Sequence, residues 1–179
     1  MLRRLKTVVN DQFLITVYHS LFHSHINYGI VLWGHAPSCN KILLLQKKAL
    51  RIITSSGHQE PCRPIFKQLN ILTVFGQYIY NSLITIHNQF SSLQSRGNVH
   101  NHNTRSSSAI DIPRCRLSKT LNSFPVAAMR RFNVLPVSLR NLDPNKFRST
   151  LKALLISRPI DSLSDFQGLW GSCHHHQVL

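Results

Sequence analysis

The sequence predicts a mainly α-helical protein, and three observations support this prediction. Apolar residues recur at spacings of three and four in several separate stretches, as they do on the buried side of a helix. Serine, aspartate and proline stand where these stretches begin, and glycine or proline follows where they end. Hydrophobic residues make up 42% of the 179-residue chain, which is enough to form a core.

The first predicted helix begins near Phe13 and ends near residues 27–29. Phe13, Val17 and Leu21 recur at every fourth position and predict one apolar face. Three further apolar or aromatic residues widen this face, namely Leu14, Tyr18 and Phe22. We expect this broad face to be buried.

The second predicted helix begins at a cap formed by residues 38–40 and ends at Gly57, a residue type common just after helices. Its apolar positions predict the side that faces the core, and its cations lie mainly on the flanks and the opposite side. The expected core residues are Ile42, Leu45, Ala49, Ile52 and Ile53. The expected outer cations are Lys41, Lys47, Lys48 and Arg51.

A third helix is expected from about Thr73 to Leu93, after a short turn that contains Ile65 and Phe66. Its expected apolar side is formed by Val74, Tyr78, Leu83, Ile84 and His87. Residues 95–108 have the lowest hydrophobicity of the chain and predict a loop or linker.

Two helices are predicted in the C-terminal part. The first has Pro125 in its first turn and stops at Pro136. The second has Asp143 as N-cap and Pro144 at its first position, and it ends near Ser157. The expected core residues of this last helix are Phe147, Leu151, Leu154 and Leu155.

These elements predict an order of four regions along the chain. A helical region covers 1–94, a polar linker covers 95–109 and a smaller helical region covers 110–158. Residues 159–179 show no periodicity, and we expect a disordered tail there.

The charge balance indicates a polyanionic partner. The chain has 21 Lys and Arg against six Asp and Glu, for a net charge of +15. No two of the six acids are adjacent, which argues against a cluster of carboxylates around divalent metals. Nucleic acid is the commonest polyanion in a cell, so RNA or DNA is the expected partner.

The basic residues alternate with uncharged segments. Residues 12–40 and 68–95 contain no Asp, Glu, Lys or Arg, and each is long enough to raise the question of a membrane span. Both segments also contain many His, Ser, Asn and Gln side chains, which a bilayer would leave without partners. We therefore expect packed helices and no membrane insertion.

The sequence contains few features typical of catalytic or metal-binding sites. The Gly-x-Ser-x-Gly elbow and glycine-rich phosphate loops do not occur, so we expect no catalytic residue and no cofactor. Residues 173–176, a Cys followed by three His, have the ligand types that zinc prefers, but a contiguous terminal cluster seldom forms a closed site, and no metal is expected. His58 and Cys62 are four apart, but the prolines around them predict a loop.

The basic blocks are the main functional candidates. They offer phosphate contacts whose strength falls with salt, and the shortage of acids argues against an ordinary mixed-charge surface. The candidate nucleic-acid-binding residues are Lys47, Lys48, Arg51, Arg105, Arg130, Arg131, Lys146, Arg148 and Lys152. Arg140 belongs to the same C-terminal block, and His100 and His102 flank Arg105 in the predicted linker, where solvation explains them nearly as well.

Several segments in fixed order resemble a known family. The N-terminal ones are YHSL at 18–21, YGI at 28–30, WG at 33–34, LQKKA at 45–49 and RII at 51–53. The later ones are IFKQLNIL at 65–72, TR at 104–105, FNVLP at 132–136, LR at 139–140 and FRSTLK at 147–152. Together they resemble the region after the polymerase palm in reverse transcriptases of non-LTR retrotransposons, the jockey-like and LINE-like elements. Ser24 and Phe132 depart from the family, where proline and tryptophan are common.

The resemblance implies a thumb-like helical bundle that packs on a palm and holds the template–product duplex. The palm, with the paired aspartates that metal-dependent nucleotidyl transfer requires, is expected upstream of this sequence, so no catalytic residue is carried over. The implied partners are RNA or DNA, bound without sequence preference, and the missing palm. Without the palm, the faces around Val17, Leu21, Ile26, Ile30 and Trp33 are expected to expose apolar surface and to favour self-association. The resemblance implies a nuclear or cytoplasmic location.

The sequence therefore leads to one main hypothesis and two alternatives. The main hypothesis is a non-catalytic fragment of an RNA-directed DNA polymerase that retains non-specific nucleic-acid binding. The first alternative is a helical protein–protein interaction module that binds an acidic partner. The second is a relic without an independent function.

Overall fold

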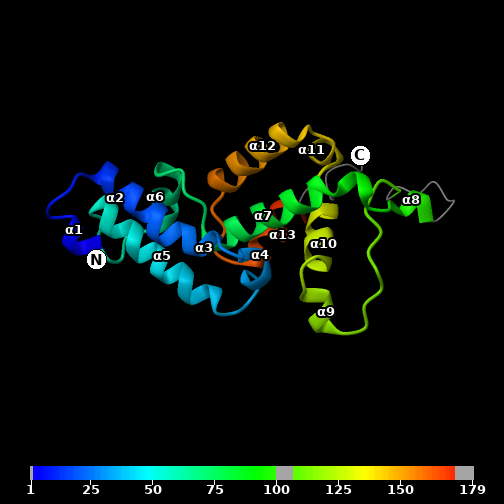
Figure 1. The fold of residues 1–179 in the computed structure, drawn as a ribbon, viewed down its shortest axis with the longest axis horizontal. Helices are drawn as coiled ribbons and strands as arrows, with labels where there is room; N and C mark the ends of the chain where they lie inside the picture. Colours follow the sequence, from blue (N-terminus) through cyan, green and yellow to red (C-terminus); the bar gives the residue numbers. More distant parts are fainter. Residues whose placement is uncertain (1, 100–106, 172–179) are drawn as a thin grey trace. The chain divides into compact units, whose positions relative to one another are not determined.

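The computed structural model describes residues 2–99 and 107–171, without the side chains of the last two (Figure 1). The predicted mainly α-helical fold is confirmed: the described residues form helices and, apart from an isolated bridge between Ser95 and Ile110, no β-structure. None of the helices in these ranges is both long and apolar enough to cross a bilayer. The chain divides into two compact units, which we describe separately.

Unit 1 contains Met1–Tyr78 and Leu154–Asp161. Its helices are α1 (Leu2–Leu5), α2 (Asp11–Val17), the π-helix η1 (Tyr18–His23), α3 (Ser24–Asn27), α4 (Ile30–Trp33), α5 (Cys39–Thr54) and α6 (Cys62–Gln68), with parts of α7 (Val74–Asn88) and α12 (Pro144–Ser157). Helices α1, α2 and α6 all pack against α5, which is the longest helix of the unit (Figure 1).

Helices α2, η1 and α3 follow one another without a break. The Asn10 side chain caps this run by accepting a hydrogen bond of 2.9 Å from the Phe13 amide. Gly29 follows the run with a φ of 60°, a conformation that glycine adopts without strain. The predicted helix that ends at residues 27–29 is thus confirmed.

The predicted broad apolar face of this helix is only partly buried. Phe13 and Leu21 are 51% and 47% exposed, whereas Leu14 and Tyr18 are fully buried. The Tyr18 hydroxyl is buried without loss of hydrogen bonding, because the side chain of Gln46 donates a hydrogen bond to it at 2.8 Å. Desolvation raises the pKa of Tyr18 to about 12, although this hydrogen bond acts in the opposite direction.

Of the five residues expected on the core side of α5, Ala49 and Ile53 are buried. The buried residues are Cys39, Leu43, Gln46, Ala49, Leu50 and Ile53. Leu45, expected in the core, is 57% exposed, and the neighbouring Leu44 is 66% exposed. The helix turned out to bury a glutamine that the apolar pattern assigns to the polar side, because that glutamine has partners in the core.

Gln46 connects three elements inside unit 1. Its Nε2 atom donates to the Tyr18 hydroxyl and to the Leu72 carbonyl, both at 2.8 Å, and its Oε1 atom accepts from the Val74 amide at 2.9 Å. Thr73 completes the cap of α7, since its hydroxyl accepts from the Gly76 amide at 3.0 Å and donates to the Ile160 carbonyl at 2.6 Å. These bonds satisfy the free backbone groups at the start of α7 and hold residues 154–161 in the unit.

Helix α5 ends earlier than predicted. Ser55 adopts the left-handed conformation with a φ of 58°, and the amides of Ser55 and Ser56 both bond to the Arg51 carbonyl. Gly57, the expected terminal residue, lies beyond this turn. A serine therefore occupies the position that glycine commonly takes after a helix.

Unit 2 contains Ile79–Ala153 and Ser162–Leu179. Its further helices are the 3₁₀-helix η2 (Phe90–Ser92), α8 (Arg96–Val99), α9 (Ser118–Asn122), α10 (Val126–Val134), α11 (Val137–Arg140) and α13 (Leu163–Gly171). The predicted helix between Pro125 and Pro136 is confirmed by α10, and the predicted helix that begins at Pro144 is confirmed by α12. The third predicted helix is present as α7, which ends at Asn88 rather than near Leu93.

Aromatic rings form the centre of unit 2. The His87 ring stacks on Phe147 with centroids 4.1 Å apart and planes at 11°, and Phe132 contacts both Phe147 and Phe90. The Asn133 side chain bonds to both backbone groups of Ile110 at 2.9 Å. Ile110, the first residue after the predicted linker, is thereby tied to α10, and Arg96–Val99 forms α8 where a loop was expected.

The expected tail at 159–179 was wrong for Leu163–Gly171, which form α13. Phe166 is fully buried, and α13 packs against α10 (Figure 1). The Ser162 hydroxyl accepts from the Asp165 amide at 3.3 Å and donates to the Asp165 carboxylate at 2.7 Å, which caps the helix. Residues 172–179 lie outside the described residues.

Candidate nucleic-acid interface

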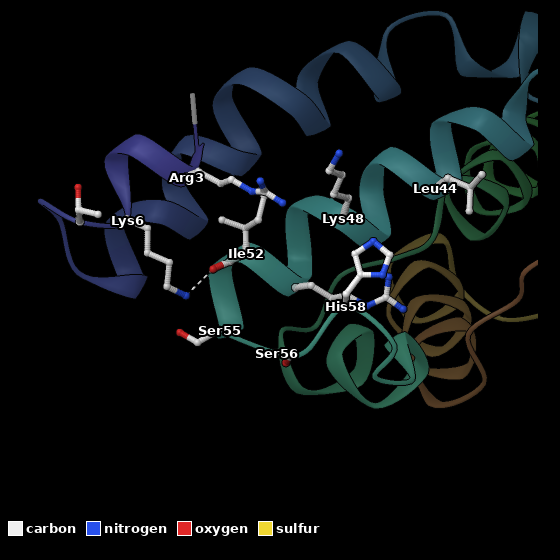
Figure 2. Close-up of a pocket in the computed structure, with 10 residues that line it drawn as sticks. Arg3, Lys6, Leu44, Lys48, Ile52, Ser55, Ser56 and His58 are labelled. Atoms are coloured by element: carbon white, nitrogen blue, oxygen red, sulfur yellow. Dashed lines mark hydrogen bonds between the residues drawn. The ribbon is translucent and has the colours of Figure 1, made fainter.

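Basic side chains gather around a pocket in unit 1. The pocket has a volume of about 600 Å³ and lies between α1, α5 and the segment after α5 (Figure 2). Its lining residues are Arg3, Lys6, Thr7, Leu44, Lys48, Arg51, Ile52, Ser55, Ser56 and His58. These ten include four Lys or Arg residues and no carboxylate, so the charge of the lining is strongly positive. We call this group the cationic pocket.

Lys6 has a structural task in the cationic pocket. Its ammonium group donates to the carbonyls of Ile52 and Ile53, the latter at 2.9 Å, and Figure 2 shows the first of these bonds. These carbonyls belong to the last turn of α5, where a helix carries partial negative charge. Lys6 therefore fastens α1 to the end of α5 and neutralises the local negative charge.

Arg51 holds the segment that follows α5. Its Nε and Nη2 atoms donate to the Glu60 carbonyl at 3.1 and 2.7 Å. The Glu60 carboxylate accepts from the Gly57 amide at 3.0 Å and does not line the cationic pocket. Arg51 thus keeps its charge unpaired while it shapes one wall.

Arg3 and Lys48 are the cations of the pocket that are exposed. Neither forms an ion pair with any residue in the described ranges. In Figure 2 their side chains extend from α1 and α5, and no hydrogen bond joins them to the other residues drawn. Both also border a neighbouring hollow of about 400 Å³ that is lined mainly by apolar residues, among them Phe22 and Leu45. They are therefore free to contact a ligand.

Lys47 differs from its neighbour Lys48. Its ammonium group pairs with an Asp161 oxygen at 2.9 Å, and the other oxygen of Asp161 pairs with Arg63 at 3.0 Å. The structure therefore places Lys47 in an internal contact of unit 1, away from the lining of the cationic pocket.

The candidate cations of unit 2 do not form one surface. Arg130 and Arg131 line a small pocket of about 140 Å³ beside Phe166. Lys146, Arg148 and Lys152 are all exposed on α12. At 100° per residue, Arg148 and Lys152 share a side of the helix, whereas Lys146 lies about 160° away from Arg148.

Neither Arg105 nor Arg140 adds to an exposed basic surface of the described residues. Arg105, like His100 and His102, lies outside the described residues. Arg140 is buried, with 7% of its surface exposed, rather than displayed on a basic face.

The described residues offer little for catalysis or metal binding. No three His, Cys, Asp or Glu side chains in these ranges come close enough to hold a metal ion. Cys62 is buried at the start of α6, whereas His58 is exposed on the cationic pocket. Burial raises the pKa of the Cys39 thiol, which disfavours the reactive thiolate. Cys173 to His176 lie outside the described residues.

Arg3, Lys6 and His58 line the cationic pocket although the sequence did not indicate them as candidates. The basic cluster near the N-terminus was visible in the sequence, but nothing there indicated that α1 folds against the end of α5. No protein-family model, no curated protein and no solved structure matches this chain. The resemblance to non-LTR reverse transcriptases stays a prediction.

Proposed function

We propose that this chain binds nucleic acid through the cationic pocket and has no catalytic activity of its own. The observation that carries the proposal is the pocket's lining, which has four Lys or Arg residues and no carboxylate. Phosphate oxygens are the natural partners of such a lining, and Ser55 adds a hydroxyl donor. Contacts of this kind read the backbone and not the bases, so binding has no strong sequence preference.

The structure sets the expected strength of the salt dependence. Arg3 and Lys48 are free to contact one phosphate each, and Lys6 and Arg51 add positive charge while they keep their internal hydrogen bonds. Each neutralised phosphate of a duplex lowers the slope of log affinity against log salt by about 0.9. Two to four contacts therefore give a slope of about −2 to −4.

We further propose that unit 1 is a thumb-like remnant of a non-LTR reverse transcriptase. The segments that carry the resemblance include residues with definite physical tasks in this fold. Tyr18 and Gln46 form the buried hydrogen-bond network, Gly29 takes the left-handed turn, and Lys48 lines the cationic pocket. This agreement between resemblance and local structure supports the proposal. It implies a palm as a partner and a template–product duplex as the ligand.

A protein partner is the second candidate, and a separate observation favours it. Among the described residues, ten large hydrophobic side chains are exposed, and seven of them belong to unit 1. These seven are Val8, Phe13, Leu21, Tyr28, Leu32, Leu44 and Leu45. Exposed apolar residues in this number are typical of a surface that another protein covers. The partner is then either a palm-like domain or an acidic protein.

A binding assay separates the two candidates. Fluorescence anisotropy is measured with labelled single-stranded RNA, duplex DNA and an RNA–DNA hybrid at several salt concentrations. We expect binding at low salt, loss of affinity as salt rises, and at least a tenfold loss in the double variant Arg3→Glu/Lys48→Glu. The matched control is Lys67→Glu, an exposed lysine of α6 that does not line the pocket. Failure to bind any of the three nucleic acids at low salt would exclude the proposal for this chain.

A further inference from the structure

Arg140 is a buried cation without a carboxylate partner. It is the last residue of α11, and its Nη1 atom donates to the Ser108 carbonyl at 3.1 Å. Its Nε atom is buried and has no hydrogen-bond partner. Arg140 forms no ion pair with any residue in the described ranges.

This arrangement is unfavourable in the protein as it stands. A buried charge is normally paired, and each buried N–H group without a partner costs about 1–3 kcal/mol. The six acids of the chain are all described, and none of them pairs with this guanidinium. Burial lowers the pKa of Arg140, but an arginine side chain remains charged in proteins. An anion in contact with the part of the guanidinium that lines a pocket would supply the missing counter-ion.

Arg140 lines a pocket within unit 2. The pocket has a volume of about 560 Å³, and its other lining residues are His87, Asn88, Phe90, Ser91, Asn141, Leu142 and Pro144. The His87 ring is held in place by its stacking on Phe147 and by a contact of 3.0 Å between its Nε2 atom and the Leu142 carbonyl. Asn88, Ser91 and Asn141 are exposed and offer amide and hydroxyl donors. The pocket therefore combines a fixed wall, a cation and neutral donors.

We propose that this pocket binds a phosphate monoester, with the Arg140 guanidinium as its counter-ion. A phosphate monoester has three terminal oxygens and accepts hydrogen bonds from the guanidinium and from several neutral donors together, whereas a carboxylate has only two oxygens. The Phe90 side of the pocket gives room for an apolar or aromatic group attached to the phosphate. The ligand is either a free mononucleotide or the terminal phosphate of a nucleic-acid strand.

The proposed site is independent of the cationic pocket. It lies in the other unit, shares no residue with the cationic pocket and takes one phosphate group rather than a run of backbone phosphates. Either site can therefore fail its test without deciding the other.

The test measures the melting temperature of the full chain at constant ionic strength, with chloride replaced by inorganic phosphate or by a nucleoside 5′-monophosphate. We expect both to raise the melting temperature of the wild-type protein in a saturable way. A second arm compares binding of oligonucleotides with a 5′-phosphate and a 5′-hydroxyl. Tighter binding of the 5′-phosphate form identifies the strand terminus as a source, and equal binding identifies the free mononucleotide. No saturable response to phosphate or to the mononucleotide would overturn the proposal.

Variants assign the response to the pocket. Arg140→Met should abolish the phosphate response, and Arg116→Met, which removes an exposed charge elsewhere in unit 2, should retain it. Arg140→Met also removes the hydrogen bond to the Ser108 carbonyl, so a second variant that leaves Arg140 and this bond in place tests the pocket independently. Ser91→Glu places a carboxylate at an exposed position of the lining, where it should compete with phosphate for the guanidinium. An unchanged phosphate response in folded Arg140→Met or Ser91→Glu protein would contradict the proposal.

Discussion

The substitution Gln46→Ala tests the buried network of unit 1. Gln46 is fully buried, and its side chain makes three hydrogen bonds of 2.8 to 2.9 Å to Tyr18, Leu72 and Val74. Removing it leaves one hydroxyl and two backbone groups in the core without their partner. At about 1–3 kcal/mol for each of the three unsatisfied buried groups, we expect a loss of about 3–9 kcal/mol in the free energy of unfolding. That loss is comparable to the whole stability of many small domains.

Chemical denaturation followed by circular dichroism measures this loss. Gln68→Ala is the matched control, because Gln68 ends α6 with an exposed side chain and its substitution should change the free energy by less than about 0.5 kcal/mol. A loss below about 1 kcal/mol in Gln46→Ala would refute the reasoning, since it would mean that water or other groups replace the glutamine without penalty.

Three further predictions concern single residues. Asp161→Asn removes the ion pairs with Lys47 and Arg63, whose side chains are partly or largely exposed. Thermal melts should therefore show a loss of only about 1 kcal/mol in the free energy of unfolding, and this loss should shrink at high salt. A loss above about 3 kcal/mol would contradict this prediction. Folding raises the pKa of Tyr18 from 10 to about 12, so the folded state holds the Tyr18 proton more tightly than the unfolded state does. The free energy of unfolding should therefore be constant below pH 10 and fall as the pH rises toward 12. Denaturation at several pH values should show this fall in the wild type and a weaker one in Tyr18→Phe, and identical profiles would contradict the assignment. Phe166→Ala should lower the free energy of unfolding by about 3–5 kcal/mol in urea melts, because the ring is fully buried. An unchanged free energy of unfolding would instead indicate that residue 166 belongs to a disordered tail.

Helix positions were easier to predict than helix faces. Asp143, Pro144 and Pro125 act at helix starts through local chemistry, and the structure confirms the helices that they begin. The face of α5 depended instead on Gln46, whose partners lie 26 and 28 residues away in the sequence. An apolar pattern treats glutamine as a surface residue, and the predicted core side of α5 was therefore partly wrong.

The missed helix α13 had a local signal that the apolar pattern did not use. Ser162 and Asp165 are three residues apart, which is the spacing of a capping box, and the Ser162 hydroxyl bonds to both the amide and the carboxylate of Asp165. This spacing is readable from sequence alone. A single aromatic residue, Phe166, then anchors the helix in the core of unit 2. One buried ring gives no periodicity, which explains why the segment resembled a tail.

The candidate site was only partly predictable for a similar reason. Lys48 and Arg51 were selected as cations of a helix, but Arg3 and Lys6 join them through the packing of α1 on the end of α5. The same composition argument selected Lys47, which is adjacent to Lys48 and yet pairs with Asp161. Charge composition therefore led to the prediction of a polyanionic ligand, and tertiary contacts decide which cations are exposed.

The most direct test of the proposed function is the slope of log affinity against log salt concentration for one DNA duplex, compared between the wild-type chain and Arg3→Glu/Lys48→Glu. The wild type should give a slope of about −2 to −4, and the double variant should bind more weakly with a slope that is shallower by about 2. A wild-type slope near zero, or the same slope and affinity in both proteins, would contradict nucleic-acid binding at the cationic pocket.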